Sequence, residues 1–239
     1  MAPTNFIWLS AEYNFAAMYS CRIPLTSIGS ATVMPAPGPA TVRLALIRTG
    51  IELFGIDYVR DKLFATIRST KIYIRPPERI AISNQLIRAY KYNAGRLGEE
   101  DSIQETITYR EFVHPMGTMF IYLQIPDVLE TDLNQILKAI GYWGQSNSLA
   151  YCLNIRQTDP EPNECAIPLR SFKLNGSVRN FFSCVTSEFR DEKVEWDEVM
   201  PFLQATKPDA VRVEIYVWPM VIYQQHSNGK ILCRGTFEA

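Results

Sequence analysis

A short run of arginine, lysine and tyrosine is the part of the sequence with the clearest chemical meaning. The stretch LIRAYKYNAGRLG interleaves Arg88, Lys91 and Arg96 with Tyr90 and Tyr92 and contains glycine. Arginine and lysine bind phosphates, tyrosine rings stack on bases, and glycine lets a hairpin bend around a strand. The pattern predicts a site for single-stranded nucleic acid. An exposed hairpin whose tyrosines cover a sheet edge is the alternative interpretation.

A second candidate site lies where an apolar helix begins, in VMPAPGPATVRLALIRTGIELFG, residues 33–55. Pro39 suits the first turn of this helix and Gly55 its end. A helix N-terminus carries free N–H groups and a partial positive charge, and Arg43 stands in the first turn. The loop before the helix can therefore form a thin wall along which an RNA backbone passes. The alternative is an ordinary proline-initiated helix.

Motifs of the common enzyme classes are absent from the sequence. GxSxG, GxGxxG and Walker-type phosphate loops do not occur, and the only histidines, His114 and His226, both adjoin turn residues. The five cysteines are scattered without a CxxC pair, which argues against a zinc site and for buried small hydrophobic residues. The adjacent acids Glu99, Glu100 and Asp101 cannot all point at one ion, so we expect neither a metal nor a cofactor.

Composition limits the broad class of the protein. The chain has 239 residues, of which 47% are hydrophobic, enough for one large domain or two small ones. It lacks an apolar run of membrane-spanning length and a secretory signal pattern, so we expect a soluble, cytoplasmic protein with no membrane partner. The segment from Arg68 to Gly98 contains seven basic residues and one acidic residue, although the net charge of the chain is −1. This segregation indicates a local polyanion site or a solvated strand face.

The elements that must position these residues follow a recognisable order. Strands are expected at residues 5–15, 71–83, 118–126 and 149–157, and helices at 39–55, 56–69 and 130–144. This is the α+β, ferredoxin-like (RRM-like) βαββαβ order, which we assign to residues 1–157 with a thumb-like hairpin insertion at 86–108. Residues 158–239 are expected to form a smaller β-rich unit with a hairpin turn at Asn228-Gly229.

Two longer strings carry a family resemblance. Two segments resemble hallmarks of the Cas-five family of CRISPR-associated proteins: MPAPGPATVRLALI, and TYREFVHPMGTMFIYLQI at residues 108–125. These are repeat-associated RNA-binding proteins of the Cascade surveillance complex. The resemblance covers residues 5–157, and residues 86–108 lie where that family inserts its thumb.

The resemblance implies a specific function and a set of contacts. It implies a non-catalytic crRNA-binding subunit of a type I CRISPR Cascade interference ribonucleoprotein, acting in antiviral defense. Such a subunit caps the 5′ handle of the guide RNA, bridges the backbone and large subunits, and meets target DNA through the complex. Carried over by position, Arg88, Tyr90, Lys91, Tyr92 and Arg96 line the thumb, while Ser20, Arg22 and Arg43 face the handle.

One branch of the family cleaves its guide precursor with a tyrosine and an adjacent Lys-His pair. Catalysis is not expected in this chain, because it lacks that pair. In this chain Val113 precedes His114, and no Lys-His dipeptide occurs. Two alternatives stay open. One is a metal-independent pre-crRNA processing endoribonuclease using His114 with Tyr109 or Lys91. The other is an unrelated ferredoxin-like structural or ligand-binding protein.

Overall fold

The computed structural model of the chain has a mixed α+β fold, which confirms the predicted class. The structure describes residues 5–25, 30–92, 103–172, 181–190, 193–199 and 210–237. Its strands are β1 Phe6–Phe15, β2 Ser30–Ala31, β3 Lys71–Arg75, β4 Arg79–Tyr92, β5 Ile103–Met116, β6 Met119–Pro126, β7 Ala150–Gln157, β8 Ile167–Pro168, β9 Phe181–Phe189, β10 Val211–His226 and β11 Gly229–Arg234. Its helices are α1 Pro39–Phe54, α2 Ile56–Tyr58, a π-helical turn Val59–Leu63, α3 Phe64–Ser69, α4 Glu130–Ala139 and α5 Trp196–Val199, with single 3₁₀ turns at Asp127–Leu129, Pro162–Glu164 and Leu169–Ser171.

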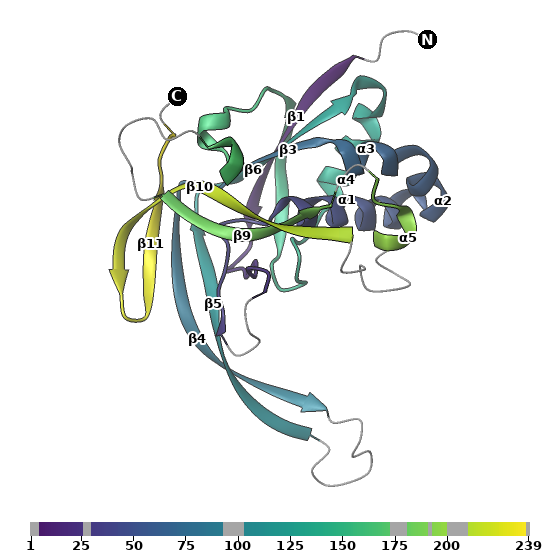
Figure 1. Ribbon diagram of the computed structural model, residues 1–239. Helices are drawn as coiled ribbons and strands as arrows, with labels where there is room; N and C mark the ends of the chain where they lie inside the picture. The colour runs from purple at the N-terminus through teal and green to yellow at the C-terminus, as the bar shows by residue number, and fades with distance from the viewer. Residues whose placement is uncertain are drawn as a thin grey trace.

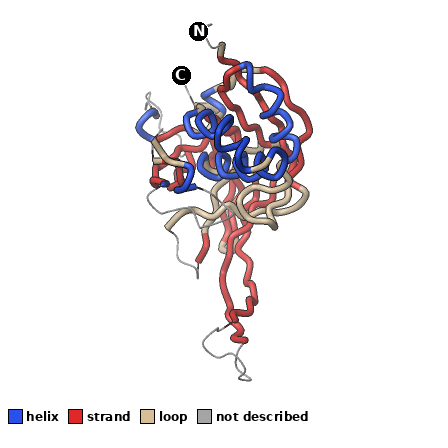
Figure 2. Tube along the Cα trace, turned by 90° about the vertical axis from the view of Figure 1, so that its right-hand side faces the viewer, coloured by secondary structure: helices blue, strands red, loops and turns tan. Residues whose placement is uncertain are grey.

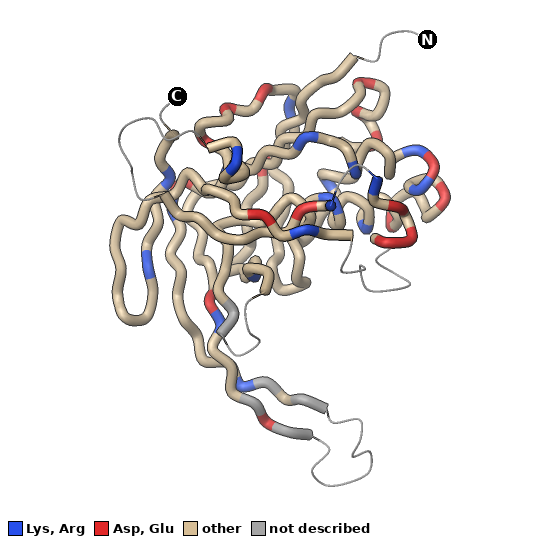
Figure 3. The backbone as a smooth tube through the Cα atoms, viewed as in Figure 1, with Lys and Arg blue, Asp and Glu red and all other residues tan. Residues whose placement is uncertain are grey.

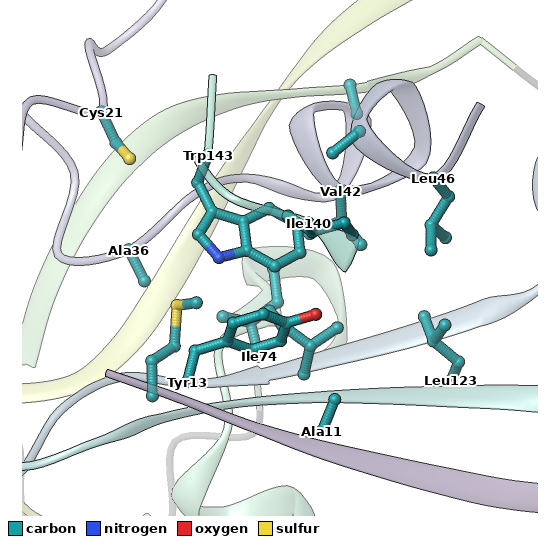
Figure 4. Close-up of a cluster of buried hydrophobic side chains, with 14 of the residues drawn as sticks. Ala11, Tyr13, Cys21, Ala36, Val42, Leu46, Ile74, Leu123, Ile140 and Trp143 are labelled. Atoms are coloured by element: carbon teal, nitrogen blue, oxygen red, sulfur yellow. The ribbon is translucent and has the colours of Figure 1, made fainter. Parts of the chain in front are cut away.

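One sheet has four strands in the order β3-β6-β1-β7, and every neighbouring pair is antiparallel. Along β1, Leu9, Ala11 and Tyr13 are buried, because alternate side chains of a strand point to the same face. Figure 4 shows this face meeting Val42 and Leu46 of α1. Helices α1 and α4 pack against each other and against β3 and β7 respectively, so they cover the buried face (Figure 1).

The core between this sheet and the helices is centred on aromatic packing. Trp143, which follows α4, meets Tyr13 edge-on with ring centroids 4.9 Å apart (Figure 4). The Tyr13 hydroxyl donates a hydrogen bond of 2.6 Å to the carbonyl of Leu137, so the buried polar tip is satisfied. Helix α1 begins at Pro39 and stops at Gly55, whose φ of 86° favours glycine, as the sequence predicts.

The second sheet joins segments that are far apart in the sequence. Its order is β2-β5-β4-β11-β10-β8, with β9 paired to β10. Strands β4 and β5 arise between β3 and β6, whereas β8 to β11 come from the C-terminal part. The C-terminal strands therefore share a sheet with the hairpin, and the predicted division at residue 157 stays a prediction.

The β4–β5 hairpin is longer than the segment predicted as a thumb. Its ladder runs from the pair Arg79–Met116 to the pair Tyr92–Ile103, so residues 86–108 contain only its distal half. That half extends well beyond the rest of the body (Figures 1 and 2). The proximal half is held by β11, because Ile80 and Ile82 pair with Leu232 and Lys230.

Strand β10 carries the apolar C-terminal stretch, and part of that stretch is exposed. Residues 216–220 are buried, whereas Val213, Ile215 and Tyr223 are 49%, 44% and 70% exposed. The β10–β11 turn is formed by Ser227 and Asn228, one position earlier than the Asn-Gly pair predicts, and Gly229 already pairs with His226. Within the described part of the chain, no helix has the length and apolar character needed to cross a membrane.

Gly229 provides a test of how the two parts of the second sheet are joined. A Cβ at this position would overlap the carbonyl oxygen of Ile82, whereas a Cβ at Gly235 would lie 3.7 Å from its nearest neighbours. We expect Gly229→Ala to push β11 away from β4 and lower the free energy of unfolding by about 1–3 kcal/mol. Gly235→Ala is the matched control and should be nearly neutral. Equal midpoints for the two variants in urea unfolding would contradict this packing.

Candidate nucleic-acid interface

The distal half of the hairpin presents a stripe of large side chains on one face. Leu86 pairs with Tyr109, and the next positions on this face bring Ile107 and Tyr90. These four side chains are between 56% and 71% exposed. Paired residues and every second residue share one face of a sheet, so the four form a continuous surface. We call it the hairpin stripe. An exposed apolar surface on a projecting element is typical of a binding site.

Two of the predicted thumb residues lie on the face of the hairpin that carries this stripe. Tyr90 is a member, and Arg88 pairs with Ile107 within it. The Arg88 guanidinium lies 3.5 Å from the carboxylate of Glu105, and both side chains are largely exposed. An ion pair in water is weak, so Arg88 can exchange Glu105 for a phosphate.

The other predicted thumb residues lie at or beyond the end of the described ladder. Lys91 and Tyr92 occupy ladder positions opposite Gln104 and Ile103, and Arg96 lies outside the described residues. Sequence reasoning considered Tyr109 only as a possible partner of His114 and did not single out Leu86 or Ile107, because it rested on basic residues and tyrosines within one segment. The signal was present as the period-two spacing of apolar residues in LIRAY and ITY.

The basic tract does not gather on the hairpin. Arg75 pairs with Glu164 at 3.1 Å and lies over the ring of Phe120, while Arg79 faces Tyr223 on β10. Most charged segments lie on the body, and few lie on the described part of the hairpin (Figure 3). The tract is thus divided between the body and the hairpin.

Ser20 and Arg22 lie where the N-terminal loop crosses the root of the hairpin. Ser20 is 2% exposed and its hydroxyl donates a hydrogen bond of 3.2 Å to the carbonyl of Glu111. Arg22 is half-buried and forms a backbone bridge with Val33. The side chain of Ser20 is therefore used internally, which corrects its prediction as a residue facing the RNA.

Arg43 also has a different role from the predicted one. It is 7% exposed, and its Nε lies 2.9 Å from the carboxylate of Glu188 on β9. Its Nη1 donates to the carbonyl of Ile67, and its Nη2 donates to the carbonyl of Thr70 at 2.9 Å. Every nitrogen of the guanidinium has a protein partner, so Arg43 joins α1, the end of α3 and β9.

The loop before α1 is interior rather than a wall along a surface. Residues 33–40 are all buried. Gly38 packs directly on β9, where a Cβ would overlap the hydroxyl of Thr186. The absence of a side chain is thus required by close packing between the helix start and a strand, and an RNA backbone has no access there.

The residues of the alternative endoribonuclease site, His114 with Tyr109 or Lys91, do not lie close together. The His114 ring lies 2.9 Å from the Ser83 hydroxyl on the hairpin surface. Tyr109 is five positions away on the same strand, about 17 Å along it and on the opposite face. His114 pairs with Ala81, and Lys91 lies ten positions further along the same strand as Ala81. Lys91 is therefore about 34 Å along the hairpin from His114.

Three of the five cysteines are buried, as the sequence predicts, and Cys152 and Cys233 are half-buried. All five are free, and burial raises the pKa of the Cys21, Cys165 and Cys184 thiols to about 12. A thiol with so high a pKa is a poor nucleophile and metal ligand at neutral pH. Over the described ranges, no group of three or more His, Cys, Asp or Glu residues could hold a metal ion.

The role of Arg43 can be measured through stability. Arg43→Ala would leave the partly buried Glu188 carboxylate and the carbonyls of Ile67 and Thr70 without their partner, and we expect a loss of about 3–5 kcal/mol in the free energy of unfolding. Adding Glu188→Gln should recover part of that loss. Arg60→Ala, which removes an exposed arginine paired with Asp57 and Asp61, is the control and should change stability far less. A wild-type urea midpoint for Arg43→Ala would rule out the structural role.

Comparison with known proteins finds similarity to CRISPR-associated proteins. The chain matches no protein-family model. It is 29% identical over 163 residues to the CRISPR-associated protein Cas5 of Archaeoglobus fulgidus, covering 67% of this chain and 68% of that protein. The fold resembles the crystal structure of a CRISPR protein from Archaeoglobus fulgidus, with a TM-score of 0.51, 11% identity and coverage of 96% and 92% of the two chains.

A second solved structure is similar over part of its length. It is a chain from the Type III-B Cmr-beta structure bound to cognate target RNA, with a TM-score of 0.50 and 9% identity. The similarity covers 63% of this chain and 60% of that one. At such low identity, these two likenesses bear on the fold alone.

Proposed function

The chain is a relative of the Cas5 family of CRISPR-associated proteins, and on this premise we propose that it is a guide-RNA-binding subunit of a CRISPR effector complex. The resemblance stated from the sequence is confirmed by the 29% identity to Cas5 over two thirds of the chain. The family name supports the CRISPR context. The contacts with RNA are supported by the chemistry of the hairpin.

We propose the finer role that the resemblance implies, a type I Cascade subunit holding the 5′ handle of the crRNA between the backbone and large subunits. In this proposal the sheet β3-β6-β1-β7 with α1 and α4 is a ferredoxin-like module. Its strand order, its antiparallel pairs and its two helical crossovers support that interpretation. The hairpin then occupies the place of the family's thumb, between the second and third strands of the module.

The observation that carries the proposal is the hairpin stripe. Tyr90 and Tyr109 offer flat rings that are 71% and 63% exposed, and Leu86 and Ile107 widen the surface. Rings of this kind stack on unpaired bases whatever the base, while Arg88 can hold a nearby phosphate. Arg88 is the one cation among the side chains described on this distal face, so stacking dominates at the hairpin.

Removing the two rings should separate this proposal from a merely structural hairpin. Each stacked base is worth about 1–3 kcal/mol, so Tyr90→Ala and Tyr109→Ala should each weaken binding of single-stranded repeat RNA by about 5- to 150-fold. Fluorescence anisotropy with a labelled 5′ handle measures the affinity. Tyr223→Ala is the control, because Tyr223 is 70% exposed but lies on β10. Unchanged affinity in both hairpin variants, with no loss of co-purified RNA, would refute the proposal.

We propose that the subunit is not a nuclease. Support comes from the missing Lys-His pair and from the separation of His114 from both Tyr109 and Lys91. Purified protein incubated with repeat RNA in EDTA should leave the RNA intact. Specific metal-independent cuts that disappear in His114→Ala would instead favour the processing endoribonuclease.

A further inference from the structure

A crevice of 420 Å³ lies between the two sheets, and its walls are basic. One wall is the end of α3 and the start of β3, with Arg68 and Lys71. The other is the 3₁₀ turn after β8 together with β10, with Arg170 and Arg212. Figure 3 shows basic segments along β3 and along the β9–β10 ribbon. We call this space the basic crevice.

Positive charge is in excess in the basic crevice. Arg43 lies in its floor, already paired with Glu188. Glu214 is shared by Arg170 at 2.9 Å and Arg212 at 3.4 Å. Among the residues that the structure describes, five cations thus face two carboxylates, an excess of three positive charges.

The excess charges are available to a ligand. Arg68 gives one hydrogen bond, from Nη1 to the carbonyl of Val194 at 3.1 Å. Considering only residues that the structure describes, no carboxylate lies within 4.0 Å of Arg68 or of the exposed Lys71. Arg170 and Arg212 remain 64% and 42% exposed even in their ion pairs, so a stronger anion can draw them from Glu214.

Two tyrosines complete the crevice. Tyr216 lies in its lining, and burial, followed by the charges of Glu188 and Glu214, raises its pKa above the ordinary value. Its hydroxyl therefore stays protonated and can donate a hydrogen bond. The half-buried ring of Tyr73 is also in the wall and gives a base a flat surface.

We propose that the basic crevice binds phosphate groups of single-stranded RNA, as an anchoring point separate from the hairpin. The inference rests on the proposed function. The volume lies within the range of sites that hold nucleotide-sized ligands. Arginine forks match phosphate oxygens, and the excess of three charges matches a few consecutive phosphodiesters. An acidic protein segment would also satisfy the charges, but it would make no use of the Tyr73 ring.

The test compares two charge-matched double variants of the full chain. Lys71→Glu/Arg212→Glu reverses one exposed cation on each wall, and Lys62→Glu/Lys138→Glu reverses two exposed lysines outside the crevice. Affinity for fluorescein-labelled oligouridylate is measured by anisotropy over a salt series. The crevice variant should bind at least about tenfold more weakly. Its slope of log affinity against log salt should fall by about 1.4, or 0.7 for each lost phosphate contact.

Folding and location are checked in parallel. Urea unfolding should show both double variants to be folded, and Lys71→Gln/Arg212→Gln should give a smaller loss in the same direction. RNA containing 4-thiouridine should crosslink to the peptide that contains Lys71 and Tyr73. Polyglutamate should compete poorly at equal charge.

The outcomes separate the two proposals. Equal affinity in the crevice and control variants, or crosslinks confined to β4 and β5, would overturn the crevice and leave the hairpin proposal intact. Equal competition by polyglutamate would identify an acidic protein segment as the occupant and overturn the RNA assignment. A wild-type chain that binds neither oligouridylate nor repeat RNA would overturn both proposals.

Discussion

The ion pair between the buried Arg43 and the partly buried Glu188 is the interaction on which the arrangement of the two sheets depends. Its guanidinium also binds the carbonyls of Ile67 and Thr70, so one side chain joins α1, the end of α3 and β9. A charge buried without its partner is costly, so these elements hold together or come apart as a unit. The β9–β10 ribbon is thereby held against the helices, and the basic crevice opens beside it.

A second constraint lies at the root of the hairpin. Strand β11 inserts between β4 and β10 and pairs with the proximal half of β4, where glycine permits close approach to Ile82. The N-terminal loop crosses the other side, with Tyr19 bridging to Val113. Strand β2 pairs with β5 at Tyr109 and Arg110, and beyond these two residues the distal half has no neighbouring strand in the described structure. A firmly held root and a free distal half suit an element that reaches a partner at a defined place.

The two proposed contact regions differ in chemistry. The hairpin stripe is aromatic and aliphatic and has one arginine, Arg88, beside it, whereas the basic crevice is cationic and has one half-buried tyrosine ring in its wall. Stacking tolerates any base and depends little on salt, while phosphate binding is strongly salt-dependent. A chain that uses both can hold a single strand by its bases at one place and by its backbone at another, without reading its sequence.

The sequence by itself determined the local elements and carried the resemblance to the Cas-five family. Period-two and helical spacing, Pro39 and Gly55 are enough to locate β1, α1, β6, α4 and β7, because these signals act between residues close along the chain. Only the tertiary structure decided which polar residues reach solvent. In the sequence, Arg43 and Lys71 are both basic residues near the start of an element. Arg43 is buried because it pairs with Glu188, which lies 145 positions away in the sequence. Lys71 has no carboxylate partner among the described residues and stays exposed. The crevice has the same origin, since Arg68, Arg170 and Arg212 come together only when β9 and β10 pack beside β3.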